Sequence, residues 1–296
     1  MNDQATRLRQ IYSSSTAATH DSGGQQLPIK TIAITSGKGG VGKSALCLNI
    51  AIALAKHNRK VLVVDADLNL GNLDVMLGMN PEHTLRNVIA GQISLRNILL
   101  QGPSGIHLAP STSGAQELID VKPGDRRRVI EAIRQLTPSY DFVLFDTPAG
   151  LGSQMYDFIE SADSVFVVTT PEPTAIIDAY AVVKMLWSRK LKKRLQLLVN
   201  YSESKIEAEE VYQKLNLVTQ HYMQQSLDDF HFVLYDEMVS KSIFDQQPMF
   251  EEHPKTPASV CIDEIAEAII KQSKVNHRIR ALKNWIGGAA EISRVG

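Results

Sequence analysis

Residues 30–44 read KTIAITSGKGGVGKS and contain the pattern that decides the fold. Residues 30–35 form a short, largely apolar run that is typical of a strand buried on both faces. Residues 37–44, GKGGVGKS, match G-x-x-x-x-G-K-[ST], and an apolar helical pattern follows at 44–57. A strand, a glycine-rich loop and a helix in this order predict a phosphate-binding loop rather than a chance glycine turn.

Two side chains of this loop carry the expected chemistry. Lys43 can reach the β- and γ-phosphates of a nucleotide, and the Ser44 hydroxyl can ligate Mg²⁺. The glycines allow the tight turn that aims backbone N–H groups at the phosphates. The nucleotide-binding positions expected in the loop are Gly37, Lys38, Gly39, Gly40, Val41, Gly42, Lys43 and Ser44.

Acidic residues follow two further predicted strands. Asp65 ends the run at 60–65, Asp67 lies two residues beyond it, and Asp146 ends DFVLFD at 141–146. Ligands of doubly wound sheets bind at the carboxyl ends of the strands, so these carboxylates are expected near the phosphate loop. Asp146 is placed to hold Mg²⁺, and Asp67 to orient an attacking water or to lie near the metal. The alternative for a single acid at a strand end is a helix N-cap.

Three patterns together resemble the MinD/ParA ATPases, which carry a deviant Walker A motif. The first is KGGVGKS with the second lysine, Lys38, directly after the first glycine. The others are D-x-D-x-x-x-x-N-L-D at 65–74 and DTPAG at 146–150. The resemblance implies a P-loop NTPase of the SIMIBI class that uses ATP and Mg²⁺.

The resemblance also implies roles for individual residues. Lys38 would contact the phosphates of the partner subunit in an ATP-bound homodimer, and Lys43 would hold those of its own subunit. Asp67 would activate the attacking water, with Asp65 supporting it and the metal site. Gly150, in the segment that matches switch II, would sense the γ-phosphate through its backbone amide.

Base recognition is the least specific part of the predicted site. Asn200 ends the apolar run at 195–200, and its amide can both donate to and accept from the edge of adenine. An asparagine at a strand end is also a common turn residue. The family resemblance favours the adenine contact, and it implies that the loop within 231–248 covers the base.

Strand-like runs alternate with helical patterns along most of the chain, which predicts an α/β fold: a doubly wound, mainly parallel sheet with helices on both faces. The expected strands are 30–35, 60–65, 106–110, 141–146, 164–169, 195–200 and 231–236. The expected helices are 44–57, 124–136, 174–187, 203–222 and 257–272. The predicted parts are a segment at 1–12, a flexible linker at 13–28, an ATPase domain at 29–273 and a C-terminal helix at 274–296.

Composition supports a folded chain without a general nucleic-acid surface. Of 296 residues, 44% are hydrophobic, which is enough for a sizeable core, and the net charge is −1. The basic clusters at 126–128 and 189–194 are therefore interpreted as solvated edges, with DNA binding as the minor alternative. The isolated Cys47 and Cys261 predict neither a disulfide framework nor a metal cluster. No signal peptide or transmembrane run is apparent, so a cytoplasmic protein is expected.

The positive charge is concentrated at the C-terminus. Residues 271–296 carry six basic side chains and one acidic one, a charge of +5, which leaves −6 on the other 270 residues. Residues 275–288 form an amphipathic helical pattern that suits an anionic membrane, the inner face of the cytoplasmic membrane, although a helix docked on the body is the alternative. The family resemblance favours the membrane. The membrane-facing candidates are Ile279, Leu282, Lys283, Trp285 and Ile286.

The first residues of the chain suggest a more specific role. On physical grounds this short terminal peptide would be disordered, but DQATRLR resembles the activator segment of the flagellar-number-regulating members of the MinD/ParA family. That resemblance implies that the segment stimulates the SRP-type GTPase FlhF and that components of the flagellar switch complex, or C-ring, are further partners. The partner-activating residues would be Asp3, Gln4, Ala5, Thr6, Arg7, Leu8 and Arg9.

The predicted function is thus an ATP-dependent, dimerising switch ATPase that associates with the membrane and regulates flagellar number or placement. The alternatives are a DNA-partitioning ATPase of the ParA type and a MinD-like regulator of the cell-division site. A reductase similar to the nitrogenase iron protein is disfavoured, because the lone cysteines match no cluster-ligand pattern.

Overall fold

The computed structural model describes residues 30–111, 122–191 and 193–273. The predicted segments at 1–12 and 13–28 and the C-terminal helix at 274–296 lie outside the described residues, as do all side chains assigned there to the membrane or to FlhF. None of the helices in the described part of the chain has the length and apolar character needed to cross a lipid bilayer.

The described strands form one eight-stranded sheet in the order β3-β4-β2-β5-β1-β6-β7-β8. Every neighbouring pair is parallel except β3 and β4, which are antiparallel at one edge. The strands are β1 (Lys30–Ser36), β2 (Val61–Asp65), β3 (Leu100–Gln101), β4 (His107–Ala109), β5 (Phe142–Asp146), β6 (Ser164–Thr169), β7 (Arg194–Ser202) and β8 (Asp229–Leu234).

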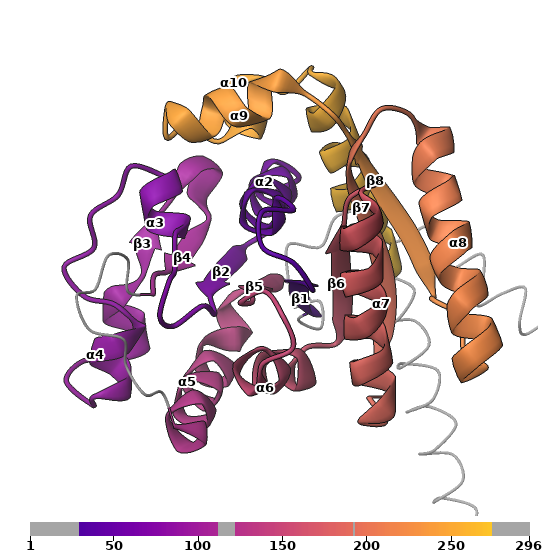
Figure 1. Ribbon diagram of the computed structural model, residues 1–296. Helices are drawn as coiled ribbons and strands as arrows, with labels where there is room; N and C mark the ends of the chain where they lie inside the picture. The colour runs from indigo at the N-terminus through magenta and orange to yellow at the C-terminus, as the bar shows by residue number, and fades with distance from the viewer. Residues whose placement is uncertain (1–29, 112–121, 192, 274–296) are drawn as a thin grey trace, which may run out of the picture.

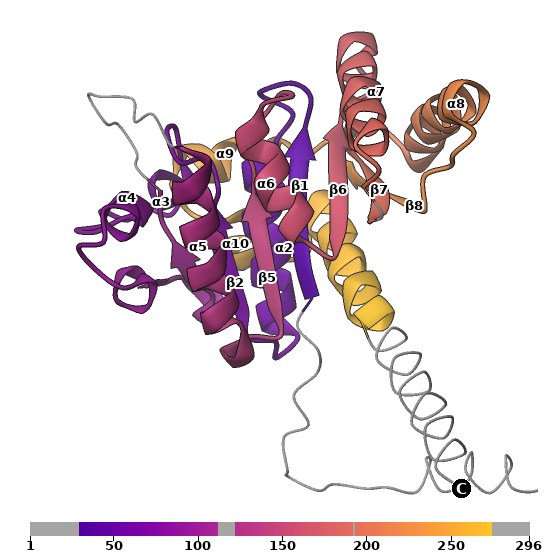
Figure 2. The same cartoon turned by 90° about the horizontal axis from the view of Figure 1, so that it is seen from below.

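Helices cover both faces of this sheet (Figures 1 and 2). On one face lie α2 (Lys43–Lys56), α10 (Met249–Glu252) and the helical residues 257–273. The helices of the other face are α4 (Leu85–Ile89), α5 (Pro123–Leu136), α6 (Ser153–Ser161), α7 (Pro173–Ser188) and α8 (Lys205–Met223). Two short helices, α3 (Leu73–Met76) and α9 (Glu237–Phe244), follow β2 and β8.

The central strand shows why the chain needs both layers. In β1, Ala33 packs into the core on one face, while Ile32 and Ile34 pack into the core on the other. Helix α2 is buried over most of its length, from Ala45 to Leu54. A strand that is apolar on both faces can be stable only when both faces are covered. The predicted doubly wound, mainly parallel sheet is therefore confirmed.

Several details differ from the predicted elements. The run at 106–110 contributes a strand of only three residues, and the last strand is 229–234 rather than 231–236. Helix α6, nine residues long, is not among the helices expected from the sequence, and it begins two residues after the DTPAG segment. The segment expected to cover the base as a loop contains helix α9, which Asp236 caps by accepting from Met238 N at 3.0 Å.

The connections place a crevice at the end of β1. The chain passes from β1 to β2 on one side and, after β5, crosses to β6 on the other side of β1. Ligands of open α/β sheets bind at such a switch point, beyond the carboxyl ends of the strands. The loop at 37–44 and the acidic residues at the ends of β2 and β5 all lie at this edge.

Candidate functional site

The loop between β1 and α2 has the backbone of an anion-binding turn. Gly40 and Gly42 have φ angles of 82° and 84°, in the left-handed region that glycine adopts readily. A Cβ atom on Gly42 would collide with Nδ2 of Asn200 and would lie 3.0 Å from Oη of Tyr201. Gly42 is also the N-cap of α2 and supplies no side-chain cap. The first N–H groups of the helix are therefore available to an anion.

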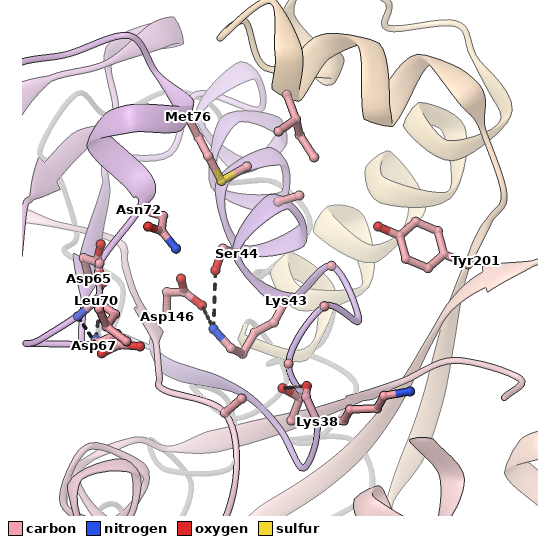
Figure 3. Close-up of a pocket in the computed structure, with 18 residues that line it drawn as sticks. Lys38, Lys43, Ser44, Asp65, Asp67, Leu70, Asn72, Met76, Asp146 and Tyr201 are labelled. Carbon is pink, nitrogen blue, oxygen red and sulfur yellow. Dashed lines mark hydrogen bonds and ion pairs between the residues drawn. The ribbon is translucent and has the colours of Figure 1, made fainter. Parts of the chain in front are cut away.

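A cavity of about 340 Å³ lies over this loop (Figure 3). The carboxylates of Asp65, Asp67 and Asp146 line it from the ends of β2 and β5. From the loop, the cavity is lined by Lys38, Gly39, Gly40, Gly42, Lys43 and Ser44. The fold thus brings the loop and the three acidic residues, which are far apart in the sequence, into one site.

An ion pair occupies the centre of the cavity. Nζ of Lys43 lies 2.6 Å from Oδ1 of Asp146 and 3.4 Å from Oγ of Ser44. Both charged side chains are largely buried, with 11% of the lysine and 3% of the aspartate exposed. The lysine therefore neutralises the aspartate in this structure.

Asp65 adds a second buried carboxyl group next to Asp146. The two residues are register partners on β2 and β5, and burial together with the charge of Asp146 raises the pKa of Asp65 well above its ordinary value. Its oxygens accept from the backbone N–H groups of Asp67 and Leu73, each at 3.3 Å. This excess of acidic groups over one buried lysine suits a divalent cation, and Ser44 and Asp146 supply the hard oxygen ligands that Mg²⁺ prefers.

Asp67 is held in the turn that follows β2. Its Oδ1 accepts from the N–H groups of Asn69, at 3.4 Å, and Leu70, at 3.1 Å. The turn also depends on Gly71, where a Cβ atom would collide with Oγ of Ser111 and Oδ2 of Asp65. A carboxylate fixed at the cavity wall in this way is suited to orienting a water molecule.

Lys38 has partners at the rim of the cavity instead of its centre. Its Nζ lies 2.7 Å from Oε2 of Glu172 and 3.3 Å from Oγ1 of Thr174, at the start of α7. The lysine side chain is 41% exposed, and it points away from Lys43 and Asp146 (Figure 3). The two lysines of the loop therefore occupy different environments.

Four of the predicted site residues support the loop without lining the cavity. Gly37 packs against α7, where a Cβ atom would collide with the carbonyl oxygen of Asp178. The carbonyl of Val41 accepts from Nδ2 of Asn200 at 2.9 Å, and Asn200 is only 4% exposed. The amide of Gly150 donates to the carbonyl of Ser36 at 2.9 Å. A contact between that amide and a γ-phosphate therefore requires this hydrogen bond to break.

The cavity also has apolar walls that the motifs did not indicate. Tyr201 lines it beside the phosphate loop, and Met76 and Ile243 contribute from α3 and α9. Burial is the main cause that raises the pKa of Tyr201 above its ordinary value. Alternation along a strand would turn Tyr201 away from the face that Asn200 occupies, so the sequence pattern gave no reason to choose it.

Comparisons with known proteins identify the family of this chain. The model of the AAA domain family matches residues 29–199. The chain is 37% identical to the antiactivator FleN of Pseudomonas aeruginosa over 246 residues, covering 83% of this chain and 88% of FleN. It is 31% identical to the flagellum site-determining protein YlxH of Helicobacter pylori over 276 residues, covering 92% of each.

A solved structure extends the comparison to the fold. The septum site-determining protein MinD of Pyrococcus horikoshii, in complex with Mg-ADP, superposes with a TM-score of 0.69 at 27% identity, over 83% of this chain and 98% of that one. These findings confirm the resemblance on which the sequence interpretation relied. The chain belongs to the MinD/ParA family of P-loop ATPases and is itself an ATPase.

Proposed function

We propose that this ATPase is a membrane-associated switch that regulates flagellar number or placement. The observation that carries the proposal is the cavity in which the deviant phosphate loop meets Asp65, Asp67 and Asp146. The similarity to YlxH, which is named as a flagellum site-determining protein, supports this role, and the similarity to the antiactivator FleN is consistent with a regulator.

Each group at the cavity has a distinct task in ATP hydrolysis. The loop amides and Lys43 bind the phosphates. Ser44 and Asp146 would hold Mg²⁺, which when bound would neutralise part of the negative charge of the phosphates. Lys43 exchanges its bond to Asp146 for bonds to phosphate oxygens. Asp67 orients the attacking water, so that attack on the γ-phosphate is in line with the leaving group.

Lys38 supports the proposal that the ATP-bound form is a homodimer. Its ammonium group lies at the rim, bound to Glu172 and Thr174, and not among the acidic groups of its own cavity. A second subunit placed face to face would bring its phosphates within reach of this exposed cation. Closing the dimer then depends on ATP, and hydrolysis releases it.

The terminal segments would connect this cycle to its partners. The amphipathic residues 275–288, part of a tail of charge +5, would bind anionic lipid on the inner face of the cytoplasmic membrane. Residues 3–9 would stimulate FlhF, and the dimer would act on the flagellar switch complex. Dimerisation doubles the number of tails, and two weak anchors bind a membrane much more tightly than one.

Stimulation of FlhF by the first residues tests the flagellar part of the proposal. GTP hydrolysis by purified FlhF is measured with the full chain and with a chain lacking residues 1–12. We expect stimulation only with the full chain, and restoration of stimulation by a peptide of residues 1–12. A control chain with Arg7 and Arg9 both changed to alanine separates sequence-specific activation from a loss of length. Equal stimulation by the deleted chain would contradict the flagellar assignment while leaving the ATPase intact.

Three arginines of the two described basic clusters are held in ion pairs, which reduces the charge that these clusters offer to DNA. Of the basic cluster at 126–128, Arg126 is paired with Asp157 at 2.6 Å and Arg128 with Asp125 at 2.8 Å. In the second cluster, Arg194 is paired with Asp229 at 3.4 Å. DNA retention by the ATP-bound protein, measured across salt concentrations, distinguishes the DNA-partitioning alternative from the proposed function, because retention by basic side chains falls steeply as salt increases.

A further inference from the structure

The end of β7 departs from regular strand geometry next to the phosphate loop. Val199 pairs with Phe232 and Ser202 with Leu234, so three steps along β7 match two steps along β8. The extra residue is a β-bulge, and Tyr201 within it has a φ angle of 58°. A left-handed backbone is unfavourable for a bulky residue, and bulges beside functional sites redirect side chains.

The bulge directs two consecutive side chains toward the same glycine. In a regular strand, neighbouring side chains lie on opposite faces of the sheet. Here both Nδ2 of Asn200 and Oη of Tyr201 are immediate neighbours of Gly42, where a Cβ atom would meet each of them. Asn200 is turned inward, where its Nδ2 donates to the carbonyl of Val41 at 2.9 Å. Tyr201 is the one of the pair that lines the cavity.

Tyr201 lies at the opposite side of the loop from the acidic groups (Figure 3). Lys43, Ser44 and Asp146 mark where the phosphates and Mg²⁺ bind under the proposed function. A nucleotide held there extends its ribose and base away from the carboxylates. An aromatic ring at the far side of the glycine loop is a suitable platform for a base, because every base presents a flat π-face.

We propose that Tyr201 packs against the purine of ATP, and that the bulge of β7 orients the tyrosine ring for this contact. Asn200 is almost fully buried and its amide donates to Val41, so it acts as a positioning residue for the loop. This inference rests on the proposed function, since it requires the cavity to bind ATP.

Binding of ATP and of inorganic tripolyphosphate, both with Mg²⁺, separates a base contact from a phosphate contact. Tyr201→Asn removes the ring but keeps a residue that tolerates the left-handed backbone, and Tyr201→Phe keeps the ring. By calorimetry we expect Tyr201→Asn to weaken ATP binding about tenfold, as for the loss of one stacking contact. Tripolyphosphate affinity should change by less than about twofold. Tyr201→Phe should bind both nearly as the parent protein does.

A matched control and a second readout guard against a folding defect. Tyr222→Asn removes a tyrosine that is 72% exposed on α8, and it should leave both affinities unchanged. Tyr201→Trp keeps an aromatic platform, and its added fluorescence, relative to the parent protein, should be quenched by ATP but not by tripolyphosphate.

The outcomes distinguish this inference from the function on which it rests. Equal loss of affinity for both ligands in Tyr201→Asn would show that the residue only shapes the loop, and would overturn the inference. Unchanged ATP affinity, or Tyr201→Trp fluorescence that is insensitive to ATP, would overturn it as well. A parent protein that binds no ATP would instead contradict the proposed function.

Discussion

Lys43 is the residue on which the charge balance of the site depends. It is bound to Asp146 at 2.6 Å, while Asp65, next to Asp146 on the neighbouring strand, has a raised pKa because of burial and of that neighbouring charge. The carboxyl groups of Asp65, Asp67 and Asp146 line the cavity that holds one buried cation, Lys43. Such an arrangement favours ligand binding at the expense of stability, as is common where a site is preorganised for a charged ligand.

We therefore expect Asp65→Asn to stabilise the protein in the absence of nucleotide and metal. A carboxyl group with a raised pKa holds its proton in the folded state but loses it in the unfolded chain above about pH 4. Its contribution to stability thus decreases as the pH rises from there toward the raised pKa. Asp65→Asn removes this loss. At pH 8 its melting temperature should exceed that of the parent by roughly 2–4 °C, which corresponds to a gain of about 1 kcal/mol in the free energy of unfolding.

The comparison is made by thermal unfolding in a metal chelator at several pH values between 4 and 8. The difference between the two proteins should be near zero at pH 4 and should grow with pH. A difference that is constant across this range would mean that Asp65 is ionised throughout, contrary to the effect of its burial.

The second lysine of the loop gives a prediction about assembly. Glu172 holds Lys38 at 2.7 Å, on a surface where both side chains are substantially exposed. Such pairs contribute about 0–1 kcal/mol, so Glu172→Gln should barely alter stability. It should instead increase the dimer fraction with MgATP several-fold, because Lys38 no longer has to leave a carboxylate to reach a second subunit.

Sedimentation of the two proteins with MgATP measures this effect. Glu210→Gln is the matched control, since it removes the carboxylate of another exposed pair, with Lys214 at 3.4 Å on α8. An unchanged dimer fraction in Glu172→Gln, or an equal increase in the control, would show that the ion pair does not compete with dimerisation.

Among the elements, α2 links the phosphate loop, which it follows directly, to α10 near the end of the described chain. Its buried Asn49 accepts from the N–H of Phe250 at 2.8 Å and donates to the carbonyl of Ala45 at 2.8 Å. Asn49 is the polar side chain within the buried, otherwise apolar stretch of α2 from Ala45 to Leu54, and it fixes α10 against α2.

We expect Asn49→Ala to lower the free energy of unfolding by about 1–3 kcal/mol, because it leaves the N–H of Phe250 buried without its partner. Chemical denaturation provides the measurement, and Asn97→Ala, at an exposed position, should change stability by less than about 0.5 kcal/mol. Similar effects for the two substitutions would indicate that Asn49 does not join the helices.

The elements also show what the sequence can and cannot predict. Seven strands and five helices followed from apolar runs and helical spacing, because burial on both faces leaves a strong local pattern. Strand β3, two residues long and antiparallel, has no such pattern. The bulge of β7 depends on pairing with β8, so local spacing pointed to Asn200 and missed Tyr201. The phosphate loop was predictable from its motif. The acidic residues at the strand ends were predictable as its neighbours, because parallel strands bring their carboxyl ends to the same edge of the sheet.

At the scale of the whole molecule, the charge distribution predicts how the ATPase reaches its site of action. The body carries −6 and residues 271–296 carry +5. An acidic body is repelled by anionic lipid, so binding should depend on the tail and on a dimer that presents two tails.

Flotation with liposomes tests this separation. A chain that ends at residue 273 should lose binding to anionic liposomes while retaining MgATP binding. The full chain should bind anionic liposomes more strongly with MgATP than with MgADP, and should bind neutral liposomes weakly in both states. Persistent binding of the shortened chain would place the membrane contact on the body.

The central claim is that ATP controls a dimer whose dissociation requires hydrolysis directed by Asp67. Light scattering of Asp67→Ala, compared in MgATP and in MgADP, tests this claim most directly. We expect hydrolysis to fall by at least about 100-fold, as for the loss of a group that directs proton transfer, so that the dimer accumulates. The account predicts twice the monomer mass in MgATP and the monomer mass in MgADP. A monomer in both nucleotides, or a dimer in both, would contradict it.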